Sequence, residues 1–143
     1  MKIVIGNDHA AVSMKQHISG YLESLGHYVI NVGVDKEDSV DYPDYAKEVA
    51  MRINNDVDFG ILICGTGIGM SIAANKFKGI RAALVYDVNT AQLAKAHNNA
   101  NIITLGARTQ TLESAMNIIK AYMDTSFEER HQTRIDKITM SEV

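Results

Sequence analysis

The sequence predicts a three-layer α/β/α sandwich of the Rossmann-like class, with a five-stranded parallel sheet at its centre. Short apolar runs alternate with longer segments of helical period, and the connections between them are short. The run at residues 59–64 has no polar break, as expected for a strand covered on both faces. We expect the strand order 2-1-3-5-4, with strands 1 and 3 adjacent, a C-terminal helix, and a single domain over residues 1–143.

Each strand corresponds to one apolar run, and each helix to apolar residues three or four positions apart. The strands are expected at residues 2–6, 28–32, 59–64, 81–86 and 101–105. The helical residues expected to face inward are Met14, Ile18, Leu22 and Leu25, then Tyr45, Val49 and Ile53, then Leu112, Ala115, Ile119 and Tyr122, and finally Ile135 and Ile138. Two further helices are expected from Ile68 or Gly69 onward and over residues 90–96.

Local signals mark several helix ends. Gly26 is a C-terminal stop for the first helix, and Pro43, the only proline, suits the first turn of the second. Ser126-x-x-Glu129 has the spacing of a capping box at the start of the last helix.

The composition argues against several classes of function. A net charge of −3 gives no field that would gather nucleic acid or an anionic membrane. The apolar runs are too short for a membrane span or a signal peptide. The single cysteine, Cys64, excludes an intrachain disulfide and fits a reducing compartment, so we expect a cytoplasmic protein. The five scattered histidines show no zinc-ligand spacing, and no metal site is expected.

Two predicted strand ends carry unusual residues. Asn7-Asp8-His9 follows the first strand, and Cys64-Gly65-Thr66-Gly67-Ile68-Gly69 follows the third. Ligands of open parallel sheets bind beyond the carboxyl ends of the strands, where the strand order reverses. If strands 1 and 3 are neighbours, these two loops face each other there.

The glycine-rich loop departs from three known types. A phosphate-binding P-loop requires a lysine where Met70 stands, and a cysteine phosphatase requires an arginine at the same place. A dinucleotide fingerprint has the spacing G-x-G-x-x-G, whereas this loop is G-x-G-x-G. What remains is a cysteine followed by amides that can converge on an oxyanion at a helix start.

Each candidate also has a purely structural interpretation. Cys64 could be a small buried hydrophobe, although three glycines in the next five residues favour a backbone that approaches a ligand. Asp8 could be a helix N-cap. Arg130 and Arg134 are spaced to share a helix face as a phosphate clamp, or they form a solvated basic face offset by nearby glutamates.

Together these residues resemble the type B ribose-5-phosphate isomerases, whose family also holds the galactose-6-phosphate isomerase subunits of the lactose pathway. The resemblance covers nearly the whole chain. It is carried by Gly6-Asn7-Asp8-His9, Asp41-Tyr42-Pro43, Cys64-Gly65-Thr66-Gly67-Ile68-Gly69, Ala73-Ala74-Asn75-Lys76, Gly79-Ile80-Arg81-Ala82, His97-Asn98-Asn99, Gly106-Ala107-Arg108 and Arg130-His131-Gln132-x-Arg134.

The resemblance implies an aldose–ketose isomerase of the pentose phosphate pathway that needs no metal or organic cofactor. Cys64 would take the C2 proton of the open-chain sugar, Thr66 would move protons between O1 and O2, and Asp8 with His97 would open the furanose ring. The residues implied to bind the enediolate, the sugar or its phosphate are His9, Tyr42, Gly65, Gly67, Ile68, Gly69, Asn98, Arg108, Arg130, His131 and Arg134.

The chain departs from the family pattern at two places. Ile68 stands where some members carry a glutamate base, which leaves Cys64 as the base. Glu128-Glu129 replaces a common Gly-Gly, and carboxylates pointing inward there would weaken a phosphate clamp. Ribose 5-phosphate and ribulose 5-phosphate are the expected substrates. The alternatives are a six-carbon phosphate, such as allose or galactose 6-phosphate, and a non-catalytic phosphosugar-binding module.

One further expectation is geometric. His97 and Asn98 precede the fifth strand and so lie at the amino edge of the sheet, whereas Cys64 lies at the carboxyl edge. We therefore expect a homodimer in which His97 and Asn98 of one chain complete the site of the other, with a tetramer formed by two such dimers as the alternative.

Overall fold

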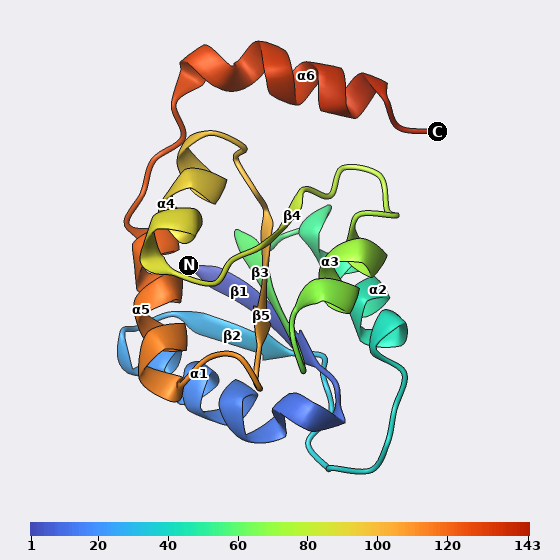
Figure 1. Cartoon of the computed structure of the whole chain (residues 1–143), viewed down its shortest axis with the longest axis vertical. Coiled ribbons are helices and arrows are strands. Elements are labelled where there is room, and N and C mark those ends of the chain that lie inside the picture. Colours follow the sequence, from blue (N-terminus) through green and yellow to red (C-terminus); the bar gives the residue numbers. More distant parts are fainter.

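Five parallel strands form one sheet in the order β2-β1-β3-β5-β4 in the computed structural model, which describes residues 1–143 (Figure 1). The strands are β1 (Lys2–Asn7), β2 (Tyr28–Asn31), β3 (Phe59–Cys64), β4 (Ala82–Leu84) and β5 (Ile102–Gly106). The helices are α1 (Val12–Ser24), α2 (Tyr42–Ile53), α3 (Ile68–Ala74), α4 (Val88–Ala96), α5 (Leu112–Met123) and α6 (Gln132–Met140), with 3-10 turns η1 (His9–Ala11) and η2 (Glu129–His131). The predicted fold class and strand order are confirmed.

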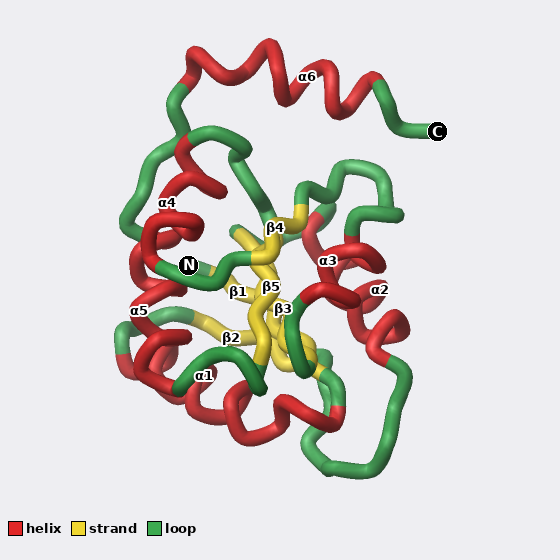
Figure 2. Tube along the Cα trace, in the orientation of Figure 1, coloured by secondary structure: helices red, strands yellow, loops and turns green.

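Helices cover both faces of the sheet (Figure 2). Alternate strand residues point to opposite faces, so Ile3 and Ile5 pack in the core beneath α1, α4 and α5, whereas Val4 packs beneath α2 and α3. All three side chains are fully buried. Their burial explains why the central strands read as uninterrupted apolar runs.

The register of the sheet brings three strand ends together. Asn7 pairs with Ile63, and Cys64 pairs with Gly106, so β1, β3 and β5 end side by side. The Asp8 amide extends this pairing by donating to the Ile63 carbonyl at 3.1 Å. The loops after these strands therefore share the carboxyl edge of the sheet.

Some local expectations were wrong. Leu25 lies beyond the end of α1 and is exposed, because Gly26 turns the chain away with a φ of 89°. Ile138 is 46% exposed, since α6 stands away from the body of the molecule (Figure 1). The predicted capping box does not form: the turn η2 begins at Glu129, and no side chain caps it.

The remaining boundaries lie within a few residues of those predicted. The largest difference is at β4, where three residues pair instead of the six expected, as befits a short strand at the sheet edge. Pro43 lies in the first turn of α2 as predicted. No helix combines the length and apolar character that crossing a bilayer requires.

Candidate active site

Cys64 ends β3 with its sulfur at the start of the glycine-rich loop. Its side chain is 6% exposed and packs in the core layer beneath α2 and α3. The Gly67 amide donates a hydrogen bond to Cys64 Sγ at 3.1 Å. Cys64 is thus surrounded by apolar residues, as its structural interpretation expected. Its sulfur nevertheless also accepts from a polar N–H group.

The end of β5 holds the loop through backbone contacts. The Ala107 amide donates to the Cys64 carbonyl at 2.8 Å, and the Arg108 amide donates to the Gly65 carbonyl at 2.9 Å. The Thr104 hydroxyl donates to the Gly67 carbonyl at 2.8 Å. These bonds fix the loop through its carbonyl groups and use none of its N–H groups.

Three amides of the loop have no acceptor in the chain. The Gly65, Thr66 and Gly69 N–H groups make no hydrogen bond, whereas the Gly67 amide bonds Cys64 Sγ and the Ile68 amide bonds Thr66 Oγ1 at 3.2 Å. Gly67 has a φ of 82°, in the left-handed region that favours glycine. Unpaired amides beside a thiol at a strand end can hold an oxyanion that forms next to the sulfur.

Asp8 and His9 lie beside this loop at the end of β1. Asp8 Oδ1 accepts a hydrogen bond from the Ala10 amide at 3.0 Å, so Asp8 does cap the turn η1. His9 Nδ1 accepts a hydrogen bond from the Val40 amide at 3.1 Å. Because Nδ1 is an acceptor, neutral His9 carries its proton on Nε2, which is then a donor for an anion or a hydroxyl.

Tyr42 and Arg108 contact the loop where it has glycines. A Cβ atom on Gly69 would lie 2.5 Å from Tyr42 Cε1, and one on Gly65 would lie 3.0 Å from Arg108 Nη1. The absence of side chains at these two positions lets the phenol and the guanidinium approach the backbone. The residues that one chain gathers at this edge are Asp8, His9, Tyr42, Cys64, Gly65, Thr66, Gly67, Ile68, Gly69 and Arg108.

A second group of predicted residues forms around His97, which follows α4. The His97 ring lies 4.5 Å from the His131 ring between centroids. One Glu128 carboxylate oxygen lies 3.5 Å from His97 Nε2 and 3.4 Å from Arg130 Nη2. The Glu128 amide donates to the Ala96 carbonyl at 2.9 Å and thereby ties this segment to the end of α4.

The tautomer of His131 decides what this second group can bind. Arg134 Nη1 lies 2.8 Å from His131 Nδ1, so Nδ1 accepts and neutral His131 carries its proton on Nε2. That Nε2 atom is buried and has no hydrogen-bond partner. Desolvation, followed by the charge of Arg130, lowers the pKa of His131 and favours the neutral ring.

The ligand atoms of His97, Glu128 and His131 lie within 4.8 Å of one another, a spacing that could hold a metal ion. However, Arg134 keeps the proton of His131 on the nitrogen that a metal would need, and Arg130 adds positive charge. Two arginines and a buried N–H donor fit an anion better than a cation.

The two groups lie at opposite edges of the sheet. Residues 97 and 98 precede β5, which begins at Ile102, whereas Cys64 pairs with Gly106 at the end of β5. Figure 1 places α6 over the edge where β5 begins. The sequence predicted this separation for His97 and Asn98, but not for Arg130, His131 and Arg134, which the structure places with His97.

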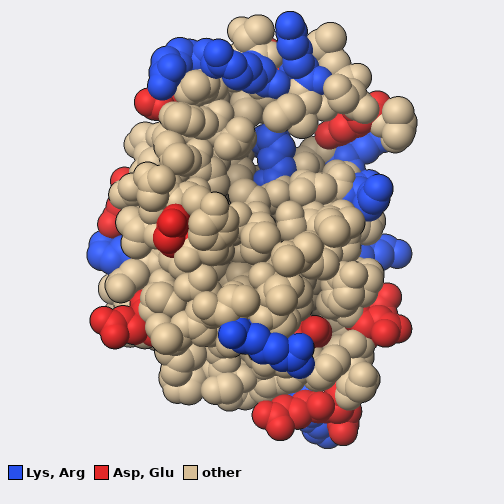
Figure 3. Space-filling model, in the orientation of Figure 1, with Lys and Arg blue, Asp and Glu red and all other residues tan.

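A cavity of about 220 Å³ opens beneath α6 at this second edge. Arg81, Asn98 and Ile138 are among the residues that line it. Figure 3 shows the opening, with blue atoms of Lys or Arg in its depth. The Asn98 carbonyl accepts a hydrogen bond from Arg81 Nε at 3.2 Å, so Asn98 belongs to the wall of this cavity and not to the edge that holds Cys64.

The sequence analysis overlooked Lys15, and for Glu128 it considered the phosphate clamp but not the contact with His97. Lys15 is buried under the loop that follows β2. It stands three and seven residues before Ile18 and Leu22, on the same helix face, and that spacing was the signal for a lysine pointing inward.

Comparison with known proteins gives a consistent result over the full length. Residues 3–138 match the Ribose/Galactose Isomerase family. Ribose-5-phosphate isomerase B of Escherichia coli strain K12 is 43% identical over 99% of this chain and 96% of its own. The crystal structure of a ribose 5-phosphate isomerase from Thermotoga maritima is 50% identical, covers 97% of each chain and has a TM-score of 0.95.

A ligand-bound structure is also among the similar proteins. Ribose-5-phosphate isomerase B from Mycoplasma genitalium, crystallised with bound ribulose-5-phosphate, has a TM-score of 0.93 and 43% identity. The match covers 97% of this chain and 94% of that one.

Proposed function

Because the chain belongs to the ribose/galactose isomerase family, we propose that it interconverts ribose 5-phosphate and ribulose 5-phosphate through an enediolate. The relatives that bear this activity in their names match over their full length, and one was crystallised with ribulose-5-phosphate. The observation that carries the proposal is the Cys64 sulfur beside a loop whose Gly65 and Thr66 amides are unpaired.

Cys64 is the base in this proposal. As thiolate it takes the proton from C2 of the open-chain aldose, and the electron pair moves into a C1–C2 double bond while charge develops on O1. Thr66 passes a proton between O1 and O2, and protonation at C1 gives the ketose. A carbon acid beside a carbonyl is weak, so the amides of Gly65 and Thr66 must hold the charge, at about 3 kcal/mol for each donor.

The other residues bind the substrate and open its ring. Asp8 and His97 exchange protons with the ring oxygen and the O1 hydroxyl, work that general acid–base catalysis speeds by about two to four powers of ten. The sugar and its phosphate contact the remaining residues, namely His9, Tyr42, Asn98, Arg108, Arg130, His131 and Arg134. The Nε2 protons of His9 and His131 suit this role, since both are donors without an acceptor in the chain.

A homodimer would unite the two groups. The second group lies at the far edge of the same chain, so the His97 side of one copy must meet the Cys64 side of another. Helix α6, which stands away from the body of the chain, supports this arrangement, because it leaves Ile138 and Met140 exposed at the edge where β5 begins. Cys64 lines neither the two cavities beside α6 nor those beside Lys15 and Tyr122, as expected if the site closes only between copies.

The activity is tested by following conversion of ribose 5-phosphate to ribulose 5-phosphate before and after alkylation of Cys64. We expect conversion by the untreated protein and its loss in step with the extent of alkylation. Activity that survives complete alkylation would remove Cys64 as the base. The same assay with allose 6-phosphate and galactose 6-phosphate decides between five- and six-carbon substrates.

The shared site is tested by mixing two inactive variants, Cys64→Ala and His97→Ala. If subunits exchange, a mixed dimer contains one site with both native residues, and up to about a quarter of all sites regain activity by random pairing. Mass spectrometry of the mixture verifies exchange. Exchanged dimers without recovered activity would contradict the shared site.

A further inference from the structure

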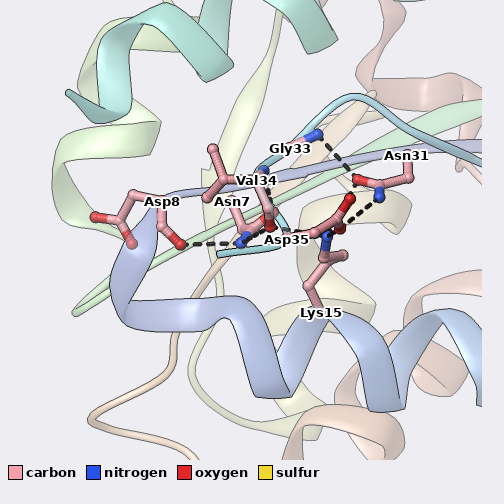
Figure 4. Close-up of polar contacts among 7 residues, drawn as sticks. All are labelled: Asn7, Asp8, Lys15, Asn31, Gly33, Val34 and Asp35. Carbon is pink, nitrogen blue, oxygen red and sulfur yellow. Dashed lines mark hydrogen bonds and ion pairs between the residues drawn. The ribbon is translucent and has the colours of Figure 1, made fainter. Parts of the chain in front are cut away.

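Lys15 carries a buried ammonium group that lies next to the candidate site (Figure 4). Its side chain is only 2% exposed. The ammonium donates to the Val34 carbonyl at 2.9 Å, to Asn31 Oδ1 at 3.3 Å and to the Asp35 carboxylate. A buried charge is costly unless it is paired, and here all three N–H donors have acceptors, so the position of Nζ is fixed.

The same network reaches the end of β1 through Asn7. The Val34 carbonyl also accepts a hydrogen bond from Asn7 Nδ2 at 3.0 Å, while the Val34 amide donates to Asn7 Oδ1 at 3.1 Å. Asn7 Nδ2 donates in addition to the Asp8 carbonyl at 2.9 Å. Figure 4 shows this path from Lys15 through Val34 and Asn7 to Asp8. The loop after β2 is thereby joined to the residue proposed to open the sugar ring.

Gly33 allows the loop to lie this close. A Cβ atom at this position would stand 1.9 Å from Asn7 Oδ1, a distance no side chain could accept. The loop continues to Val40, whose amide donates to His9 Nδ1, and then to Tyr42 at the start of α2. One segment therefore bonds Asn7, the residue that donates to the Asp8 carbonyl, through Val34 and bonds His9 through Val40.

We propose that Lys15 is a positioning residue for Asp8 and His9: its ammonium holds the Val34–Asp35 turn, and that turn holds the backbone from which both side chains project. The inference rests on the proposed isomerase function. The hydrogen bonds from Lys15 and then Asn31 lower the pKa of Asp35, which keeps the partner carboxylate charged at neutral pH. Asp8 serves ring opening and Cys64 serves proton transfer at carbon. Loss of Lys15 therefore slows ring opening more than it slows proton transfer.

Two measurements separate these steps. Ribulose 5-phosphate has no furanose form, because the oxygen on C5 carries the phosphate. Exchange of a C1 proton of this ketose with solvent deuterium, followed by NMR, therefore reports proton transfer by Cys64 without ring closure. Net conversion of ribose 5-phosphate requires ring opening as well. A variant that only destabilises the fold lowers both rates together.

The test compares Lys15→Met with Lys120→Met. Methionine keeps the unbranched buried side chain as far as Cε and removes the ammonium, and Asp35, whose side chain is 66% exposed, can turn to water. Lys120 forms an exposed ion pair with Asp124, so its variant removes a lysine without touching the network. We expect Lys15→Met to lower net conversion about tenfold and to change exchange by less than about threefold, and Lys120→Met to leave both unchanged.

Asp35→Asn provides a second variant that removes no buried group. It should shift the ratio of exchange to conversion in the same direction by a smaller factor, and it decides the question if Lys15→Met does not fold. Equal losses of both rates, or unchanged rates in both variants, would overturn the role of Lys15. A native protein with neither rate would instead contradict the proposed function, and the positioning role with it.

Discussion

Replacement of Gly67 by alanine perturbs the backbone that holds the sulfur of Cys64. Gly67 has a φ of 82°, and its amide donates to Cys64 Sγ at 3.1 Å. An added Cβ atom would lie 2.9 Å from the carbonyl carbon of Leu105 and 2.8 Å from Leu84 Cδ1. The leucine side chain can move, but the backbone of β5 cannot without disturbing the sheet.

The magnitude has two parts. A left-handed conformation costs an alanine about 1–2 kcal/mol. Relief of the contact with the Leu105 backbone adds about 1–3 kcal/mol, the usual range for overpacking. We therefore expect the free energy of unfolding to fall by about 2–5 kcal/mol. The loop must also move away from β5, which displaces its amides, and loss of one aligned donor lowers kcat by about a hundredfold or more.

Gly26→Ala is the matched control. Gly26 has a φ of 89°, and no heavy atom lies within 4 Å of its added Cβ, so this variant has the backbone strain without the contact. It should lose about 1–2 kcal/mol and keep its kcat. Urea unfolding gives the stabilities, and conversion of ribose 5-phosphate gives kcat for both variants and the native protein.

The comparison has clear contrary outcomes. A Gly67→Ala variant with native kcat would show that the loop geometry does not serve catalysis. Equal stability losses at Gly67 and Gly26 would show that the approach of β5 to the loop imposes no constraint.

Three further perturbations address other parts of the molecule. Tyr122→Phe removes a buried hydroxyl that donates to a backbone carbonyl at 2.5 Å, and should cost about 1–2 kcal/mol in urea unfolding with no change in kcat; an unchanged stability would contradict that bond. His131 has a lowered pKa in the folded chain, so the unfolded chain binds more protons, and stability should fall as the pH drops below 6.5. His131→Gln should flatten a plot of melting temperature against pH below pH 6.5. An unaltered slope would show that another group causes the pH dependence. Glu128→Gln removes the carboxylate 3.4 Å from Arg130 and should lower KM for the sugar phosphate about threefold. Glu129→Gln, the neighbouring control, should leave KM unchanged, and equal KM values for the two variants would count against competition at Arg130.

Strands were the most predictable part of the fold. Residues 59–64 form the central strand β3, which is buried along its whole length, and such a strand can only be apolar. The meeting of the Asp8 and Cys64 loops followed from the rule that parallel strands end at one edge, and the pairing of Asn7 with Ile63 confirms their proximity.

The C-terminal region was less predictable because its position depends on contacts distant in sequence. Helical spacing placed Ile138 inward, but α6 has little of its own chain to face, so Ile138 stays exposed. The location of Arg130 and His131 is set by the hydrogen bond from the Glu128 amide to Ala96, which joins segments about thirty residues apart in a way no local pattern encodes. The Lys15 network likewise joins α1 to a loop whose path the sequence did not show.

Because main-chain atoms support the Cys64 loop, side chains around it can change without moving it. Ala107 and Arg108 hold the loop with their amide groups, which every residue except proline possesses. A substitution that replaces the guanidinium of Arg108 leaves this amide in place and so does not displace the Cys64 sulfur. Substitutions of side chains around the site can therefore change the length of the sugar that is accepted, while the residues that transfer the proton stay in place.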